Sequence, residues 1–291
     1  MRDSNPSYPP LTIMSSRLFQ SSLDADVILV SRQEDDPVQF NVHKCILAAA
    51  SPFFADMFSL PQSPRPSDEI ETRRPIIPMS ESRPVIAALL QFIYPVEDPK
   101  IDSLDELVPI LAAATKYDIT PVISTLGKVL LSPHFVETEP TRVYAIASRF
   151  DMEEEAKIAS KYTLNVNLLE APLSDDLKYI TAHSYIRLLS LHRRRVDAAV
   201  AMLKPPQNMM CMQCNGSAFS VYCIPKWWYE FEKRARVELS SRPTTDVIFG
   251  VEFLGQAVSA SGCTRCPGSV LDSWKFLQEL KDAIDRLPST I

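Results

Sequence analysis

Two copies of the pattern Cys-x-x-Cys-x-Gly constrain the fold of this chain more than any other feature. They begin at Cys211 and Cys263, and 48 residues separate the first pair of cysteines from the second. Two thiolates three residues apart on a tight turn can face one metal ion, and a following glycine can take the positive φ that closes the turn. Two such turns supply the four sulfurs of a closed, structural zinc site. The intervening chain must then fold so that its ends meet. The predicted ligands of a structural Zn²⁺ are Cys211, Cys214, Cys263 and Cys266.

Two other interpretations of these cysteines stay open. They could be thiols without a metal, or they could hold an iron–sulfur cluster, which four thiolates also suit. Five of the six cysteines lie in the last third of the chain. In a chain whose N-terminus shows no apolar signal-peptide core, this clustering favours a metal over disulfides. The fifth, Cys223, stands between Tyr222 and Ile224 and is predicted to be a core residue.

Composition limits the functional classes. Of 291 residues, 46% are apolar and 23% are charged, which is typical of a globular protein with a buried core. The net charge of −6 weighs against a protein that coats nucleic acid or an anionic membrane, and no apolar run is long enough to cross a bilayer. We therefore expect an intracellular protein that binds neither nucleic acid nor a membrane. Nucleus and cytoplasm are not distinguished.

No motif of a common enzyme is present. The chain has only six glycines and neither glycine-rich phosphate-binding pattern, G-x-x-x-x-G-K-[ST] or G-x-G-x-x-G. Its four histidines lie in no H-E-x-x-H motif, and no G-x-S-x-G elbow occurs. A closed four-cysteine zinc site also has no open coordination position for catalysis. The protein is predicted not to be an enzyme.

The pattern of residues 24–131 predicts a small sheet followed by helices. Residues 26–30 form a buried-strand pattern and residues 38–42 alternate, which together predict a hairpin. A short edge strand is predicted at 76–79. The predicted helices are 43–50, 83–94, 104–117 and 119–131.

This order of elements, together with specific residues, resembles the BTB/POZ domain. The resemblance covers residues 24–131 and depends on the joint spacing of several short pieces. These are Asp26-Val27, His43-Lys44, Leu47, Ser51-Pro52-Phe53-Phe54, Met57-Phe58, the segment 89–94 ending in Tyr94, and the alanine-rich segment 112–117 ending in Lys116-Tyr117. The resemblance implies a helical cluster capped by a small sheet. It also implies protein–protein association, commonly as a homodimer, with recruitment of a cullin ubiquitin ligase or a transcriptional co-repressor.

The resemblance assigns Asp26, His43 and Lys44 to a charged pocket near the dimer interface. The alternative is structural: Asp26 caps a strand turn and His43 satisfies a hydrogen bond in the core. The chain departs from the family at Pro95-Val96-Glu97, where small residues are usual. The apolar-x-acid motif of cullin-recruiting members is also not seen, since Ile70 is followed by Glu71 and Thr72. A cullin partner is therefore possible without its recruiting motif.

The rest of the chain is predicted to be helical, with a cysteine-rich end. Helical patterns occur at 139–149, 153–162, 174–178 and 182–204, and two prolines end the last one. By position, this stretch is similar to the helical extension after many BTB domains. A final helix is predicted at 269–286, and the aromatic run 227–231 is predicted to be core. Two basic runs, 193–195 and 233–236, are interpreted as charge-mixed, solvated helix faces, and His192 beside the first is placed on such a face.

The predicted fold class is therefore α+β: a BTB/POZ helical cluster with a small capping sheet, a helical extension, and a small zinc-stabilised C-terminal domain. The predicted domains are a flexible segment 1–22, the BTB/POZ domain 23–131, the extension 132–204 and the zinc-binding domain 205–291. The predicted function is dimerisation and recruitment of an unidentified protein partner. The alternatives are a transcription regulator whose zinc module contacts DNA, and a cullin ubiquitin-ligase substrate adaptor.

Overall fold

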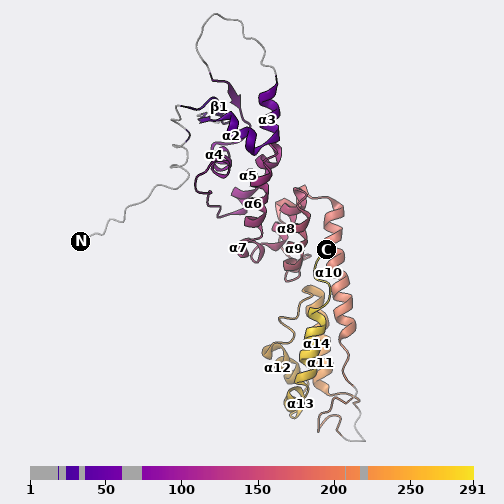
Figure 1. The fold of residues 1–291 in the computed structure, drawn as a ribbon. Helices are drawn as coiled ribbons and strands as arrows, with labels where there is room; N and C mark the ends of the chain where they lie inside the picture. Colours follow the sequence, from indigo (N-terminus) through magenta and orange to yellow (C-terminus); the bar gives the residue numbers. More distant parts are fainter. Residues whose placement is uncertain (1–18, 20–23, 33–36, 61–73, 207, 217–221) are drawn as a thin grey trace, which may run out of the picture. The chain divides into compact units, whose positions relative to one another are not determined.

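The computed structural model describes residues 19, 24–32, 37–60, 74–206, 208–216 and 222–291 (Figure 1). The chain divides into two compact units, residues 1–135 and 136–291, and each is described by itself. Apart from Phe19, the predicted flexible segment 1–22 lies outside the described residues. The four domain limits predicted from the sequence stay predictions.

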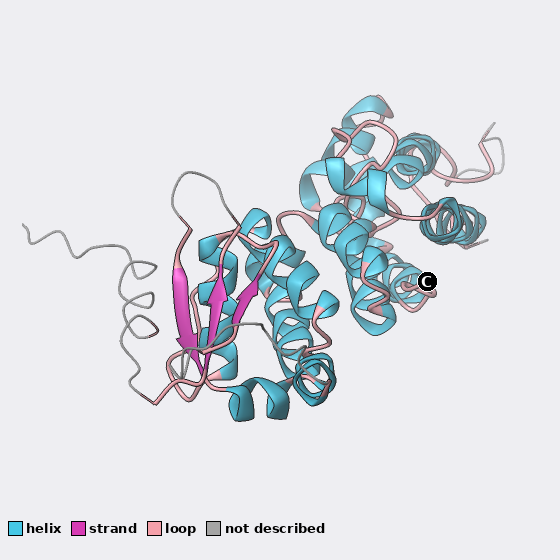
Figure 2. Cartoon of the chain, turned by 90° about the horizontal axis from the view of Figure 1, so that it is seen from above, coloured by secondary structure: helices cyan, strands magenta, loops and turns pink. Residues whose placement is uncertain are grey.

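The first unit is an α+β fold built on a three-stranded sheet (Figure 2). Strand β1 (Val27–Val30) lies in the middle, antiparallel to β2 (Gln39–Val42) and parallel to β3 (Ile76–Pro78). The predicted hairpin and edge strand are thereby confirmed. Alternate residues of the two longer strands are buried, as expected of a sheet with one face on a core.

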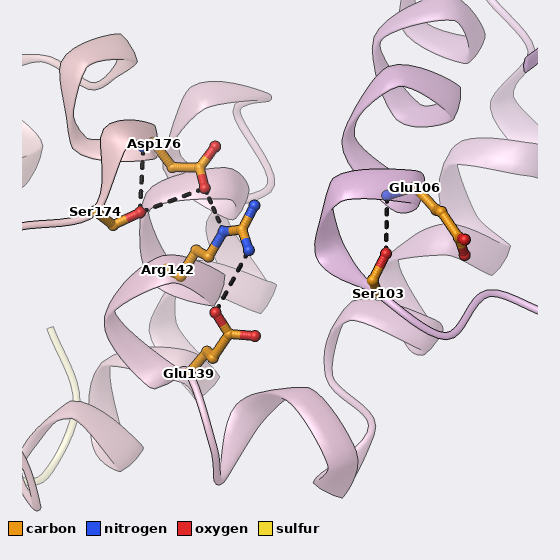
Figure 3. A network of polar contacts seen from close by, with 6 residues as sticks. All are labelled: Ser103, Glu106, Glu139, Arg142, Ser174 and Asp176. Atoms are coloured by element: carbon orange, nitrogen blue, oxygen red, sulfur yellow. Dashed lines mark hydrogen bonds and ion pairs between the residues drawn. The ribbon is translucent and has the colours of Figure 1, made fainter.

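Helices complete the core of the first unit. They are α2 (Lys44–Ala50), α3 (Pro52–Ser59), α4 (Arg83–Ile93), α5 (Leu104–Lys116) and α6 (Thr120–Leu130), followed by the short α7 (Pro133–Val136). Helix α2 stops at Ala50 because Pro52 restricts the residue before it. Ser51 then caps α3, since its Oγ accepts from the Phe54 N–H at 3.1 Å. Ser103 caps α5 in the same way through the Glu106 N–H (Figure 3).

The second unit is helical throughout its described elements. In chain order these are α8 (Pro140–Arg149), α9 (Glu153–Thr163), a 3₁₀ turn η1 (Asp175–Tyr179), α10 (Ala182–Met202), α11 (Lys226–Ser241), α12 (Val251–Ala260), α13 (Cys266–Asp272) and α14 (Trp274–Asp285). The single helix predicted over 269–286 is wrong. The helix is interrupted at Ser273, whose φ of −92° and ψ of 5° depart from helical values although its N–H still donates to the Ser269 carbonyl at 3.1 Å.

A buried ion pair fixes η1 against α8 (Figure 3). Arg142 on α8 donates through Nε to Asp176 Oδ2 at 2.6 Å, and Asp176 is 8% exposed. Glu139 lies 3.4 Å from the same guanidinium, and Ser174 accepts from the Asp176 N–H at 3.2 Å. Because the carboxylate is paired and hydrogen-bonded, its burial is tolerated.

The basic run on α10 is not a uniformly solvated face. Arg193 and Arg194 are exposed, but Arg195 is 6% exposed. Helix α10 packs against α11 and α14, and Arg195 points into that contact. The predicted solvated face is therefore wrong for this residue, because position on the helix and not charge decides which side chain is buried.

His192 is also partly buried, which corrects its predicted place on a solvated face. Its Nε2 lies 3.1 Å from Thr163 Oγ1, and that hydroxyl donates its proton to the Ser160 carbonyl at 2.6 Å. The imidazole must then donate to the hydroxyl, which requires a proton on Nε2. Burial lowers the pKa of His192 to about 4. The histidine is therefore neutral at physiological pH.

This neutral histidine predicts acid sensitivity of the second unit. Because the folded pKa is below the ordinary value of about 6.5, the unfolded chain binds the proton first as the pH falls. The stability that the neutral ring contributes should be complete above pH 6.5. As the pH falls from 6.5 to 4, the free energy of unfolding should decrease by at most about 1.4 kcal/mol per pH unit. Urea unfolding at stepped pH should show this slope weakened in His192→Gln but not in His183→Gln, an exposed histidine on the same helix. Equal slopes in both variants would contradict it.

Among the helices that the structure describes, none combines the length and apolar character needed to cross a bilayer.

Candidate metal centre

Four sulfurs from two distant segments meet in the second unit. The first pair lies in the turn of residues 211–216, after α10 has ended. The second pair lies where the chain leaves α12 and enters α13, which begins at Cys266. All four side chains are buried, and they form one group with the aromatic core of α11. The structure thus brings together the four cysteines named from the sequence: Cys211, Cys214, Cys263 and Cys266.

The distances between the sulfurs fit one tetrahedral ion. The Sγ atoms of Cys211 and Cys263 are 3.7 Å apart, those of Cys214 and Cys266 are 3.9 Å apart, and those of Cys211 and Cys266 are 4.0 Å apart. All four ligand atoms lie within 4.8 Å of one another. With zinc–sulfur bonds of about 2.3 Å, the edge of a regular tetrahedron is about 3.8 Å. The group can therefore hold a metal ion such as zinc. Thiolates bound to different irons of a cluster would lie further apart, because each binds its own iron from outside.

In the absence of a metal ion, burial makes deprotonation of these thiols unfavourable. Burial raises the pKa of Cys266 to about 12 and also raises that of Cys214. Burial acts in the same direction on Cys263, but a hydrogen bond from the Arg265 backbone and contacts with the other sulfurs outweigh it, and its pKa is about 7. A divalent cation removes the cost of several buried thiolates at once.

Polar groups of the neighbouring chain hold the two turns in place. The backbone N–H of Lys226, at the start of α11, donates to Cys214 Sγ at 3.4 Å. Gln213 connects the two turns, since its Oε1 accepts a hydrogen bond from Thr264 Oγ1 at 2.9 Å. Partners of this kind orient metal ligands.

Asn215 closes the first turn from inside. Its Oδ1 accepts from the Cys211 N–H at 2.5 Å, and its Nδ2 donates to the carbonyls of Met209 at 2.9 Å and Cys223 at 3.4 Å. Sequence reasoning missed Asn215 and Gln213 as supporting residues. The available signal was their position, because each lies inside or directly beside the first Cys-x-x-Cys pair.

The glycines of the two motifs do not have the role expected of them. Among the described glycines a positive φ occurs at Gly262, and neither Gly216 nor Gly268 has one, so the predicted role in closing the turn is wrong. Gly216 is needed for a different reason. A Cβ there would lie 2.9 Å from Met212 Cα and 3.1 Å from the Cys211 carbonyl oxygen. Gly268 lies within α13, and a Cβ there would meet nothing within 4 Å.

This difference predicts opposite results for two alanine substitutions. Gly216→Ala should weaken zinc binding about tenfold, because the backbone of the first turn must shift to admit the methyl group. Gly268→Ala should leave zinc affinity unchanged and stabilise the unit by about 0.5–1 kcal/mol, since alanine is preferred to glycine inside a helix. Competition with a chromogenic chelator and thermal unfolding measure the two effects. Similar zinc affinities for both variants would show that the close approach at Gly216 is not required.

The aromatic run 227–231 beside the centre is core except at Tyr229, which is 46% exposed, so the prediction is wrong for that residue. Trp227, Trp228 and Phe231 are fully buried on α11. Trp227 Nε1 donates to Ser269 Oγ at 3.0 Å, and that hydroxyl donates to the Met210 carbonyl at 2.7 Å. Helix α11 is thereby connected to both sulfur-bearing segments.

Cys223 is exposed, so its predicted place in the core is wrong. It lies on the loop before α11, and its backbone carbonyl, which faces Asn215, makes the inward contact. Apolar neighbours in sequence do not bury a side chain when the loop turns it outwards.

In the first unit, the predicted interface residues make local structural contacts. Asp26 Oδ1 accepts from the Lys44 N–H at 2.7 Å, at the first turn of α2. The His43 N–H donates to the Tyr94 hydroxyl at 2.8 Å, and His43 Nε2 lies 3.3 Å from an oxygen of Asp24. The Lys44 ammonium lies 5.9 Å from the ring centre of Phe58. Asp26 thus contacts the start of α2 and not a strand turn, and a role of these residues at an interface stays a prediction.

Comparison with known proteins gives one match. Residues 16–134 match the family model described as the BTB/POZ domain, a range that includes the segment whose residues resemble that family. No curated protein matches the chain. BTB/POZ is a family of protein-interaction domains, so the first unit carries an interaction domain. The match ends before the metal centre, which stands on its own geometry.

Proposed function

We propose that this chain, whose residues 16–134 form a BTB/POZ domain, is a non-enzymatic module that dimerises through that domain and recruits a protein partner. Its second unit carries a structural zinc ion on Cys211, Cys214, Cys263 and Cys266. The observation that supports the first part is the family match, and the observation that supports the second is the buried tetrahedron of sulfurs. A four-thiolate site is closed to substrates, so zinc here stabilises and does not catalyse.

The dimer predicts a mass in solution. Light scattering after size exclusion at micromolar concentration should give about twice 32.7 kDa. Lys44→Glu tests the predicted interface without removing the cap on α2, because the Lys44 backbone and not its side chain contacts Asp26. We expect this variant to shift towards monomer.

An unchanged dimer in Lys44→Glu would remove Lys44 from the interface but leave dimerisation intact. A strict monomer in the unmodified protein would contradict the dimer itself. It would leave one-to-one partner capture as the function of the BTB/POZ domain. Binding of a purified cullin N-terminal domain would favour the adaptor alternative.

A further inference from the structure

An asparagine–glycine pair lies inside the first sulfur-bearing turn. Asn215 directly follows Cys214, and it is the only one of the chain's six asparagines that precedes a glycine, Gly216. An asparagine in this position is the kind most prone to lose its side-chain amide spontaneously, because a following residue without a Cβ does not hinder ring closure. The first turn of the metal centre thus contains a reactive pair whose fate depends on its contacts.

The loss of the amide needs neither an enzyme nor an oxidant. The backbone nitrogen of Gly216 attacks Asn215 Cγ, a C–N bond forms, and the Cγ–Nδ2 bond breaks. Nδ2 leaves as ammonia together with the amide proton of Gly216. The resulting five-membered succinimide then takes up one water molecule. Opening at one carbonyl gives aspartate, and opening at the other gives isoaspartate, which adds one carbon to the backbone.

The folded turn opposes the first step of this reaction. Asn215 Nδ2 donates to the carbonyls of Met209 and Cys223, and expulsion of Nδ2 requires both hydrogen bonds to break. The Oδ1 atom of the same side chain accepts from the Cys211 N–H. Gly216 is packed closely as well, since a Cβ there would lie 2.9 Å from the backbone of the same turn. The reaction therefore requires the turn to open.

A bound zinc ion controls how often the turn opens. Two of the four ligand sulfurs, those of Cys211 and Cys214, belong to this turn, and the ion joins them to the two sulfurs of the other turn. Metal binding at such a site stabilises the folded state, so the loaded turn opens rarely. Without the ion the same turn opens more often, and the asparagine becomes free to react.

Aspartate does not restore the contacts of Asn215. One carboxylate oxygen can still accept from the Cys211 N–H, but the other replaces a donor and faces the carbonyl oxygens of Met209 and Cys223. Both of those hydrogen bonds are lost, and the new negative charge lies beside four thiolates whose charge exceeds that of one Zn²⁺. Isoaspartate also lengthens the backbone of the turn. Each product therefore weakens zinc binding.

We propose that Asn215-Gly216 is a zinc-protected deamidation site. The loaded centre preserves the asparagine, whereas loss of zinc permits its conversion to aspartate or isoaspartate, which opposes rebinding of the metal. A period without zinc is thereby recorded as a permanent covalent change in the chain. This proposal rests on the proposed function, because the protection depends on a structural zinc ion.

The first test uses the unmodified full chain, either zinc-loaded or treated with a strong chelator, during incubation at physiological temperature and pH. Mass spectrometry of peptic peptides measures conversion at Asn215, and an isoaspartyl-specific methyltransferase labels the isoaspartate. We expect conversion to be at least about tenfold slower in the zinc-loaded chain, because the attack requires the turn to open. Asn208, an exposed asparagine that precedes methionine, is the internal control and should stay unconverted in both samples.

Two variants test the consequence for the metal centre. Asn215→Asp should bind zinc about tenfold more weakly in competition with a chromogenic chelator, as expected when a group that orients a metal ligand is lost. Asn208→Asp introduces the same charge at an exposed position between α10 and the first turn. It should bind zinc as tightly as the unmodified chain.

Three results overturn the proposal: equal conversion of Asn215 in both samples, no conversion in the chelated sample, or equal zinc affinities of the two variants. Zinc content is measured on every sample before incubation. A chain that holds zinc but gives one of these results refutes this proposal alone. A chain that takes up no zinc refutes the metal centre on which it rests.

Discussion

Replacing Cys211 by serine should release the metal and unfold the cysteine-rich part of the second unit. Structural zinc sites contribute about 10–16 kcal/mol in zinc-finger peptides, which equals or exceeds the total stability of an ordinary domain, about 5–15 kcal/mol. Cys211 Sγ lies within 4.0 Å of two other ligand sulfurs. With serine at this position only three cysteine ligands remain, and they no longer enclose the cation completely. Metal analysis should fall from about one zinc per chain to almost none.

The chain offers a selective reporter for this unfolding. Its three tryptophans are Trp227, Trp228 and Trp274, all between the two ends of the predicted zinc-binding domain. Two of them are fully buried on α11 beside the metal centre. Their emission should shift to longer wavelength in Cys211→Ser, and the same shift should follow removal of the metal from the unmodified protein with a strong chelator. The BTB/POZ domain contains no tryptophan and does not contribute to this signal.

Cys223→Ser is the matched control, because Cys223 is exposed and lies outside the sulfur group. It should keep its zinc and its tryptophan spectrum. Zinc retained by Cys211→Ser, or no metal in unmodified protein purified with reductant and without chelator, would refute the structural zinc site. Iron bound in place of zinc would keep the tetrahedral site and change the identity of its ion.

The spacing of the cysteines predicted the centre because a Cys-x-x-Cys turn is a local structure, set by residues that are neighbours in sequence. The hairpin of β1 and β2 was predictable for the same reason. The surroundings of the metal centre could not be predicted from the sequence. Whether Cys223 is exposed depends on the path of the whole loop, and the need for Gly216 depends on how closely the backbone passes Met212.

Arg195 shows most clearly where local patterns fail. Beside Arg193 and Arg194 it belongs to a basic run, and the run as a whole predicts a solvated face. Its partners in the fold are carbonyl groups 48 to 93 residues further along the chain. No pattern within α10 contains that information, because the contact exists only after α14 has packed against α10.

Replacing Arg195 by methionine should destabilise the second unit by about 3–5 kcal/mol, because hydrogen bonds from a charged group contribute about 1.5–3 kcal/mol each and removing the buried charge recovers part of that loss. Its guanidinium donates to Pro243 O at 2.9 Å, Leu287 O at 2.5 Å, Pro288 O at 3.1 Å and Ile284 O at 3.2 Å. Burial lowers the pKa of Arg195, so the charge is held at a cost in solvation. Those hydrogen bonds offset this cost, and they reach the Ile284 carbonyl in the last turn of α14 and the Leu287 and Pro288 carbonyls just after the helix. Methionine keeps the length of the side chain but removes all of these hydrogen bonds.

Two further variants separate the hydrogen bonds from the charge. Arg194→Met removes an exposed guanidinium whose Nε donates to the Ser190 carbonyl of its own helix, and it should change stability by less than about 0.5 kcal/mol. Arg195→Lys keeps the charge but loses the planar fork, so its loss should lie between the other two. Urea unfolding followed by tryptophan emission measures all three in the same unit. If Arg195→Lys were as stable as the unmodified protein, a point charge near the end of α14 would be sufficient. If Arg195→Met were equally stable, the carbonyls must reach water, and the buried fork would not be what joins α10 to α14.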